Sequence, residues 1–260
     1  MLGNRNGCEP LGSLVYAHST RLTGPEISMN SVYVEGVYIG KAKNLGHGLV
    51  IDIDKQRLER RTWLWPQGLG CDEHGDPRFH TGPERALHHY PAEHYAYWRT
   101  LYPHIDWSAP AFGENLSTLG LTEEHACLGD MFRWGTALLQ ISQPRSPCYR
   151  LSQRWGLQDM PQQAQDSGRC GWFYRVLKPG FVSASDPFEL VQRSYPGLTV
   201  AWALRSFYTE PLERAGLKKL VDCPALASRW RDIALKRLRT GQVEDWTDRL
   251  LGLPLVGLRA

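Results

Sequence analysis

Short runs of β-branched and aromatic residues follow one another along most of the chain after residue 30. The first are "SVYVEGVYIG", "GLVIDID" and "RRTWLW", each bounded by glycine or by charged residues. Similar runs return in "ENLSTLGL", "MFRWGTALLQIS" and "GWFYRVLKPGFVSASDPFELVQR". Runs of this length, rich in Val, Ile, Tyr, Trp and Thr, predict strands, and the frequent turn residues between them favour antiparallel pairing. We therefore expect a mainly β fold.

Turn signals divide the later strands. Gly129-Asp130 and Gly135-Thr136 bracket a predicted hairpin, and Lys178-Pro179-Gly180 joins two further strands. Proline and glycine in these positions favour tight turns. Asp130 could serve as an acid, but an aspartate between glycine and a strand more often stabilises the turn itself.

Helical spacing is predicted in two places. The segment 67–103 begins as a loop rich in Gly, Asp and Pro and passes into a helix on which Glu93, Tyr97 and Thr100 share one side. After Pro196 the apolar residues recur at helical intervals, with Thr199 as a candidate N-cap. Breaks follow near Pro211, Pro224 and Gly241. These features predict a small helical module over residues 197–260, preceded by a β domain over 31–196.

Composition narrows the class of protein. The 260 residues carry a formal net charge of +3, which is too small to indicate nucleic-acid binding by the surface as a whole. No uninterrupted apolar run is long enough to span a bilayer, and residues 1–30 contain neither a secretory h-region nor sustained periodicity. We interpret residues 1–30 as a poorly ordered extension without an assigned role. Six cysteines are scattered singly with no CxxC pair, so we expect a cytoplasmic protein with reduced thiols.

The loop "ISQPRSPCYRL" contains the most informative cysteine. Pro144 and Pro147 end the preceding strand and stiffen the loop, which places Cys148 between Arg145 and Arg150. Nearby cations favour the thiolate, which is the form that acts as a nucleophile or as a ligand for a soft metal. A buried structural cysteine surrounded by surface arginines is an equally good interpretation of this loop alone.

The segment "FHTGPERALHHYPAEHY" concentrates histidines behind a glycine-rich turn. Gly82 would let backbone N–H groups approach a phosphate, Pro83 suits the first turn of a helix, and His80 and Arg85 would add positive charge. For His88, His89 and His94 we favour a solvated or packed helix face. Zinc binding by Cys71, His74 and His80 is the weaker alternative, since the spacing fits no common zinc pattern. In "APAFGENLST", Asn115 could bind a heterocycle or phosphate, although asparagine near glycine is more often a turn residue.

Four segments together resemble one family. They are "HTGPERALHHYPAEHYAYW", "APAFGENLSTLGLTEE", "LGDMFRWGTALLQISQPRSPCYRL" and "GWFYRVLKPG". Their order and content are similar to those of YiiM-type MOSC-domain proteins, and the resemblance extends from about Val37 to Trp246. It implies a MOSC-type β-barrel with peripheral helices, followed by a C-terminal three-helix module, and a pocket that holds the molybdenum cofactor, a molybdopterin bound to molybdenum.

The same resemblance implies roles for individual residues. Cys148 corresponds to the family cysteine that ligates molybdenum, a role that suits a soft thiolate. Other residues should lie on the cofactor side of the pocket, with Lys41 as a further phosphate candidate: Arg145, Ser146, Asn115, His80, Gly82 and Arg85. Relatives commonly carry glycine where this chain has Thr81, so a Cβ now stands where the backbone had been bare.

The family is associated with reduction of N-hydroxylated compounds such as hydroxylaminopurines. The resemblance therefore implies a molybdenum-dependent oxidoreductase that detoxifies such bases. The chain has neither an iron–sulfur cysteine pattern nor a GxGxxG fingerprint, so a separate flavoprotein or ferredoxin should supply electrons. The alternative is a non-catalytic molybdopterin-binding or sulfur-carrier protein that uses a Cys148 persulfide.

The helical module permits two interpretations. Its basic run "SRWRDIALKRLRTG" could dock an acidic redox partner, and we favour this use of the charge over DNA binding because no recognition motif is present. Alternatively, an apolar face that includes Trp202, Leu204, Trp230 and Leu238 covers the barrel and shapes the mouth of the pocket.

Overall fold

The computed structural model describes residues 32–40, 43–44, 50–51, 55–70, 72 and 82–252. The predicted N-terminal extension and three predicted site residues, Lys41, His80 and Thr81, lie outside these residues. The strands are β1 (Tyr33–Gly40), β2 (Lys43–Asn44), β3 (Val50–Ile51), β4 (Lys55–Arg57), β5 (Thr62–Trp65), β6 (Gly68–Leu69), β7 (Leu87–Pro91), β8 (Leu116–Leu119), β9 (Met131–Trp134), β10 (Ala137–Pro144), β11 (Trp172–Lys178), β12 (Gly180–Val182) and β13 (Phe188–Gln192). The helices are η1 (Pro83–Arg85), α2 (His94–Leu101), α3 (Arg150–Trp155), α4 (Met160–Ser167), α5 (Val200–Leu204), η2 (Arg205–Thr209), α6 (Arg214–Val221), α7 (Ser228–Thr240) and α8 (Thr247–Leu251).

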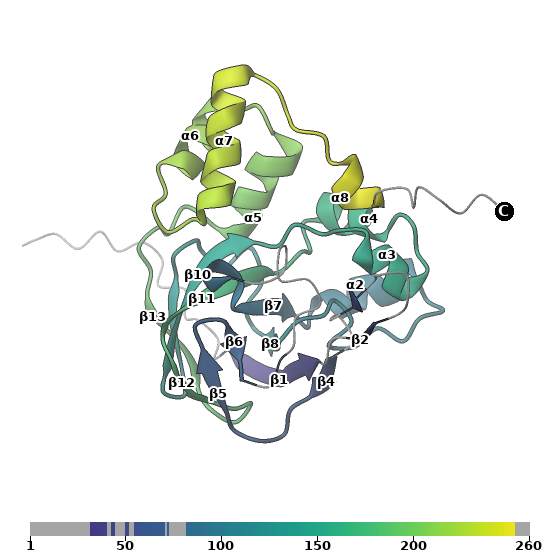
Figure 1. Ribbon diagram of the computed structural model, residues 1–260, viewed down its shortest axis with the longest axis vertical. Helices are drawn as coiled ribbons and strands as arrows, with labels where there is room; N and C mark the ends of the chain where they lie inside the picture. The colour runs from purple at the N-terminus through teal and green to yellow at the C-terminus, as the bar shows by residue number, and fades with distance from the viewer. Residues whose placement is uncertain are drawn as a thin grey trace, which may run out of the picture.

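A curled eight-stranded sheet forms the body of the protein. Its strand order is β13-β9-β10-β11-β7-β8-β1-β4, and a three-stranded sheet of β12, β5 and β6 accompanies it. Figure 1 shows the sheet curving into a half-barrel, with α5, α6 and α7 at one end and α2, α3 and α4 along one side. Within the larger sheet the strands pair antiparallel except for β7 with β8. The mainly β prediction with a C-terminal helical module is therefore confirmed.

The hairpin of β9 and β10 turns at Gly135 and Thr136, as the sequence predicts. Gly135 has a φ of 55°, and a Cβ at this position would lie 2.4 Å from the carbonyl oxygen of Phe181. This turn therefore needs glycine both for its left-handed backbone and for the close approach of the neighbouring chain.

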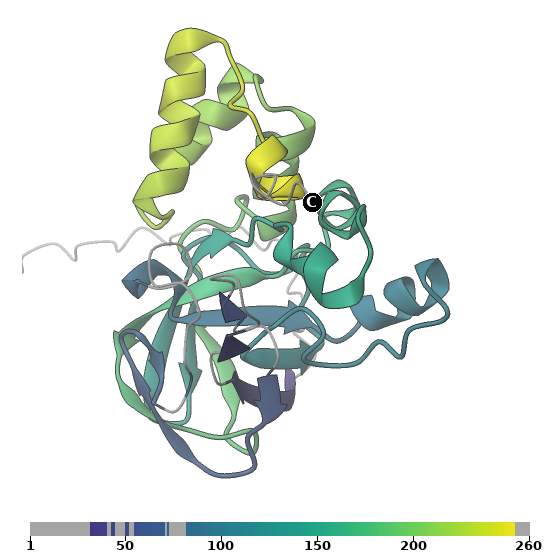
Figure 2. The same cartoon turned by 45° about the vertical axis from the view of Figure 1, so that its right-hand side comes forward.

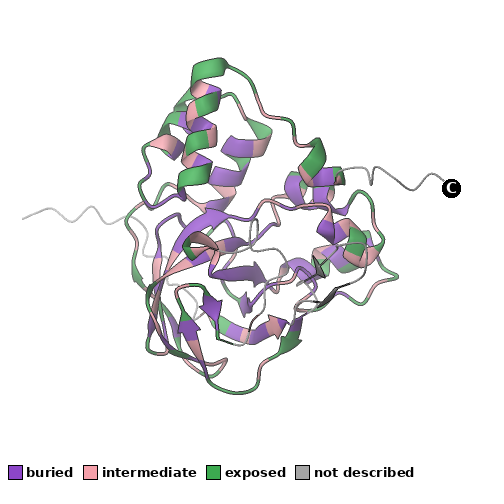
Figure 3. Cartoon of the chain, viewed as in Figure 1, coloured by how far each residue is buried: buried purple, intermediate pink, exposed green. Residues whose placement is uncertain are grey.

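One hydrophobic core runs from the sheet into the helical module. It joins sheet residues such as Leu87 and Phe132 to Leu204, Leu217 and Trp230 of the module. Figure 3 shows the buried residues continuing from the sheet into the facing sides of these helices. The apolar face predicted for the module therefore packs on the half-barrel, and Thr199 caps α5 by accepting a hydrogen bond from the amide of Trp202 (3.0 Å). Among the residues that the structure describes, no helix is long and apolar enough to cross a bilayer.

The segment after Gly82 differs from the prediction. Pro83 does begin a helical turn, but η1 ends after Arg85, and Leu87–Pro91 forms strand β7 in the middle of the sheet. His88 and His89 are therefore strand residues, and only His94 lies on a helix, at the start of α2. The helix face predicted for His88 and His89 is wrong, because Leu87–Pro91 gains ladder hydrogen bonds on both sides as a strand.

Arg237 fixes the end of α7 from inside the module. Its side chain is fully buried and donates to Glu244 (3.0 and 2.5 Å) and to the carbonyl of Phe207 (2.7 Å). Burial alone would raise the pKa of Glu244, but hydrogen bonds from Arg237 and Trp246 outweigh it and lower that pKa from 4.5 to about 2. The segment after α7 is thus held to the module by a charged pair.

We predict that Arg237→Met lowers the free energy of unfolding at pH 7 by about 3 kcal/mol, because Glu244 and the Phe207 carbonyl lose their partner. Since the pair depresses the pKa of Glu244, its contribution is complete above the unfolded pKa of 4.5 and is lost as pH falls through about 2. Urea unfolding at several pH values measures this. Arg239→Met, on an exposed position of the same helix, should change stability by less than about 0.5 kcal/mol. Equal losses of stability in the two variants would contradict a stabilising role for the Arg237–Glu244 pair.

Candidate functional site

The loop that carries Cys148 connects β10 to α3. Pro144 is the last residue of β10, and α3 begins at Arg150. The amide of Arg145 donates to the carbonyl of Gly171 (3.0 Å), which ties the start of the loop to the beginning of β11. The prolines therefore end the strand as predicted, and the loop starts from a fixed point.

Cys148 is half-buried, whereas the other described cysteines, Cys127, Cys170 and Cys223, are buried. All four are free thiols. Burial raises the pKa of Cys127 to about 11 and also raises the pKa values of Cys170 and Cys223. Among the described residues, Cys148 is therefore the thiol best placed to meet a ligand.

Two polar side chains, His88 and Gln143, stand on strands on either side of β11 beside this loop. In the sheet register His88 of β7 pairs with Phe173 of β11, and Phe173 pairs with Gln143 of β10. Three buried atoms here have no hydrogen-bond partner among the described residues: Nε2 of His88, Nε2 of Gln143 and Nη1 of Arg145. Burying such a group without a partner costs about 1–3 kcal/mol, a cost that a polar ligand bound here would offset.

Positive charge gathers at the same place. The guanidinium of Arg85 lies 5.6 Å from the ring centre of Phe173. Burial lowers the pKa of Arg85, and the neighbouring cations of Arg229 and Arg145 lower it further, while charge on Cys148 or Tyr208 would raise it. Burial, reinforced by the charge of Arg145, also holds the pKa of His88 well below 6.5, so its imidazole is neutral at pH 7. Cations that lower one another's pKa values are stabilised by an anion between them.

Arg145 and Ser146 belong to the Cys148 loop, and the charge of Arg145 acts on Arg85. The hydroxyl of Ser146 accepts a hydrogen bond from Tyr208 of the helical module (2.7 Å). Gly82 has a φ of 119°, and no atom of the described residues lies within 4 Å of a Cβ built on it. The predicted roles of these residues toward a cofactor stay predictions.

The amide of Asn115 is already used inside the protein. Its Oδ1 accepts from the amide of His88 (3.2 Å), and its Nδ2 donates to the Tyr38 carbonyl (3.2 Å) and to Asp72 (2.6 Å). Asp72 in turn pairs with the buried Lys55 (2.6 Å). Asn115 therefore fixes β7, and a cofactor contact would require it to exchange one of these bonds.

Other candidates from the sequence have structural roles. Asp130 accepts from the amide of Cys127 (2.9 Å) and pairs with Arg193 (2.6 Å), as expected of a turn residue. Both ring nitrogens of His89 are engaged, with the Tyr174 hydroxyl (3.0 Å) and the Thr118 hydroxyl (2.8 Å). The described residues contain no cluster of three His, Cys, Asp or Glu side chains suited to a metal ion, and all three residues of the zinc alternative, Cys71, His74 and His80, lie outside them.

Comparison with known proteins assigns the family. The MOSC domain profile matches residues 76–189, and the profile of the YiiM-like 3-alpha helix domain matches residues 198–241. Protein YiiM of Escherichia coli is 42% identical over 222 residues, which is 85% of this chain and 99% of that protein. The chain belongs to the YiiM-type family of MOSC-domain proteins.

Further relatives agree with this assignment. The crystal structure of Escherichia coli YiiM superposes with a TM-score of 0.74, at 39% identity over 86% of this chain and all of that one. The structure of YiiM from Geobacillus stearothermophilus gives 0.70 at 34% identity, covering 80% of this chain and 99% of that one. A protein of Gibberella moniliformis named "Reductase" is 33% identical over 75% of this chain, which corresponds to 35% of its own length.

The sequence does not indicate two residues of this candidate site, His88 and Gln143. Both stand on strands that are buried over most of their length, and the segment around His88 resembles a helix when it is considered alone. The signal that could have found them is a polar residue within a short apolar run next to a proline: His88 in "ALHHYP" and Gln143 in "LLQISQP". The strand register that brings them into one row depends on pairing between segments far apart in the sequence, so a local pattern cannot show it.

We predict that Gln143→Met leaves the stability of the ligand-free protein unchanged or higher, because a buried amide without a partner is removed. Binding of the cofactor should weaken roughly five- to tenfold, the effect of one lost hydrogen bond. Thermal unfolding and cofactor titration measure the two effects.

The matched control is Gln140→Met on the same strand. Gln140 accepts from Arg175 (2.6 Å) and donates to the Gly129 carbonyl (3.3 Å), so this change should cost about 1–2 kcal/mol of stability and spare cofactor binding. If Gln143→Met instead destabilises the protein and retains the cofactor, Gln143 belongs to the packing and not to the site.

Proposed function

We propose that this chain is a molybdenum-cofactor-dependent reductase of N-hydroxylated compounds, in which Cys148 ligates the metal. The overall reaction is R–NHOH + 2 e⁻ + 2 H⁺ → R–NH₂ + H₂O. The observation that supports it is the half-buried Cys148 thiol beside three buried polar atoms that have no partner among the described residues. Membership of the MOSC family supplies the class of cofactor.

The residues present fit that cofactor. A molybdopterin carries a phosphate and a heterocycle with several hydrogen-bonding atoms, and the site offers guanidinium, amide and imidazole groups to them. Arg145 and Arg85 would meet negative charge, and Gln143 would donate to a carbonyl or ring nitrogen. When bound, the cofactor supplies two-electron oxygen-atom chemistry at a metal that accepts a soft thiolate ligand.

The protein contributes binding, orientation and charge. Arg145 is 92% buried, so its interaction with an anion is screened little by water. His88 is neutral at pH 7, and its Nε2 can donate or accept a hydrogen bond according to its tautomer. The backbone contact of Arg145 to Gly171 holds the beginning of the Cys148 loop while these side chains bind.

Electrons would come from a separate protein of the flavoprotein or ferredoxin type in the cytoplasm, where thiols stay reduced. The chain corresponds to about a third of the fungal protein named "Reductase", whose remaining length has no counterpart here. Arg229, Lys236 and Arg239 are exposed on α7 and offer a basic surface to an acidic donor. Nucleic acid and membrane have no part in this proposal.

Cys148→Ala tests the proposal directly. The variant should fold normally, lose reductase turnover on a hydroxylaminopurine and retain less molybdenum, because a single loop side chain that carries no core packing is removed. Turnover with a small-molecule reductant and metal content by mass spectrometry measure this. Cys223→Ala, at a buried position in the helical module, is the matched control and should keep both.

Three outcomes would contradict the proposal. Full turnover by Cys148→Ala would exclude the ligand role. Wild-type protein made in a cofactor-competent host that contains labile sulfur but neither molybdenum nor pterin would favour a sulfur carrier. Loss of activity in Cys223→Ala without unfolding would assign the chemistry to another thiol.

A further inference from the structure

Residues of the C-terminal helical module contact the Cys148 loop on both sides of the cysteine. The hydroxyl of Tyr208, in η2, donates to Ser146 (2.7 Å), and Nη1 of Arg249, in α8, donates to the carbonyl of Pro147 (2.5 Å). The amide of Tyr149 donates to the carbonyl of Arg249 (2.9 Å). The residues immediately before and after Cys148 are therefore bonded to the C-terminal part of the chain.

Arg249 is itself held in place. Its Nη2 donates to Gln165 of α4 (2.6 Å), and its guanidinium lies 5.2 Å from the ring centre of Tyr208 and 5.8 Å from that of Trp246. Trp246 donates to Glu244 (2.9 Å), the partner of the buried Arg237. A connected set of contacts thus runs from the interior of the helical module to the cysteine loop.

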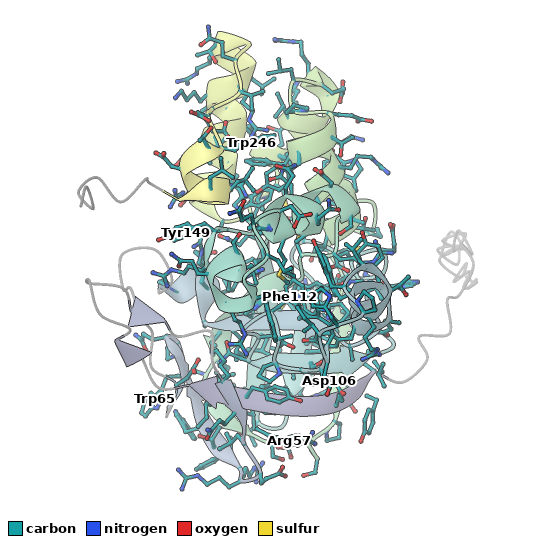
Figure 4. The ribbon with its side chains drawn as sticks, turned by 90° about the vertical axis from the view of Figure 1, so that its right-hand side faces the viewer. Arg57, Trp65, Asp106, Phe112, Tyr149 and Trp246 are labelled. Atoms are coloured by element: carbon teal, nitrogen blue, oxygen red, sulfur yellow. The ribbon has the colours of Figure 1, made fainter. Side chains whose placement is uncertain are left out.

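The path of the chain fits this arrangement. Figure 2 shows α8 folded back from the end of α7 onto α3 and α4, and Figure 4 shows Trp246 among the helices of the C-terminal module with Tyr149 below it. A Cβ built on Gly252, just after α8, would lie 3.1 Å from the ring of Tyr149, so the backbone packs closely on that ring. η2 is a π-helix that follows directly on α5, and π-helical turns are frequent at functional sites.

We propose that Tyr208 and Arg249 are positioning residues that hold the Cys148 loop in the conformation that presents its thiol to the metal. This inference rests on the proposed function for the role of the thiol, but the contacts belong to the protein without a cofactor. Arg249 and α8 lie beyond residues 198–241, the part matched by the 3-alpha domain profile. A metal ligand on a loop needs such support, because a thiol that samples many positions binds weakly.

The test uses Arg249→Met, Arg249→Lys and Tyr208→Phe in the full-length, cofactor-free protein, with Arg239→Met as the matched control on an exposed arginine of the same module. Two rates are measured: alkylation of Cys148 by iodoacetamide, read from the Cys148 peptide by mass spectrometry, and amide hydrogen exchange over residues 145–150. Neither rate depends on the reductase reaction, so the result separates failure of this inference from failure of the proposed function.

Arg249→Met should accelerate both rates roughly tenfold, because a charge-assisted bond to the loop is lost. Arg249→Lys should give intermediate rates, since an ammonium can reach one of the two acceptors but cannot span both. Tyr208→Phe should accelerate exchange at Ser146, and Arg239→Met should change nothing. In protein loaded with cofactor, molybdenum retention should fall in the same order.

Rates in Arg249→Met and Tyr208→Phe equal to those of Arg239→Met would overturn the proposal. So would faster exchange in Arg249→Met that Arg249→Lys does not reduce, because the effect would then reflect general loosening of α8. If Arg249→Met fails to fold, Tyr208→Phe, which removes a single hydroxyl, decides the question by the same comparison.

Discussion

Burial of the Arg145 guanidinium is the constraint on which the rest of the site depends. Arg145 is 92% buried and its Nη1 has no partner in the described part of the chain, a state that costs free energy in the protein alone. Its position is fixed by the end of β10 at Pro144 and by the backbone bond to Gly171. The fold thus holds a desolvated cation next to Cys148, and an anionic ligand that binds there recovers that free energy.

The sheet and the helical module meet at this point, which gives the module a structural part in the site. The hydrophobic core is continuous between them, and the amide of Ala227 donates to the carbonyl of Ser142 on β10 (2.9 Å). Arg175 joins Glu84 of η1 (3.0 Å) to the carbonyl of Ala225 (2.8 Å). These bonds bring Arg85 and Arg229 into one electrostatic environment, so the charge of the site comes from both parts of the chain.

Local chemistry in the sequence predicted much of the fold and the central thiol. Gly135, Thr199 and the prolines around Cys148 act through their own backbone or through neighbours a few residues away, and each has the predicted effect. The segment "ALHHYP" forms a strand where the sequence predicts a helix face, because its few residues carry no clear period. Its strand state depends on β8 and β11, which lie far away in the sequence.

The same limit applies to the site. Cys148, Arg145 and Arg85 stand in recognisable motifs, whereas His88 and Gln143 become neighbours only through the register of β7, β11 and β10. The contacts of Tyr208 and Arg249 span 62 and 102 residues of sequence, so no local pattern could indicate them. Nearby motifs therefore indicate the candidate thiol, and the tertiary structure shows which residues bond to its loop.

X-ray absorption at the molybdenum edge tests the central claim most directly. Wild-type protein and Cys148→Ser would both be loaded with cofactor and compared for the sulfur neighbours of the metal, since a hydroxyl keeps the size of the side chain but not its soft donor. Cysteine ligation predicts that the variant loses a sulfur neighbour at the distance of a thiolate bond. Identical sulfur coordination in the two proteins would contradict the account.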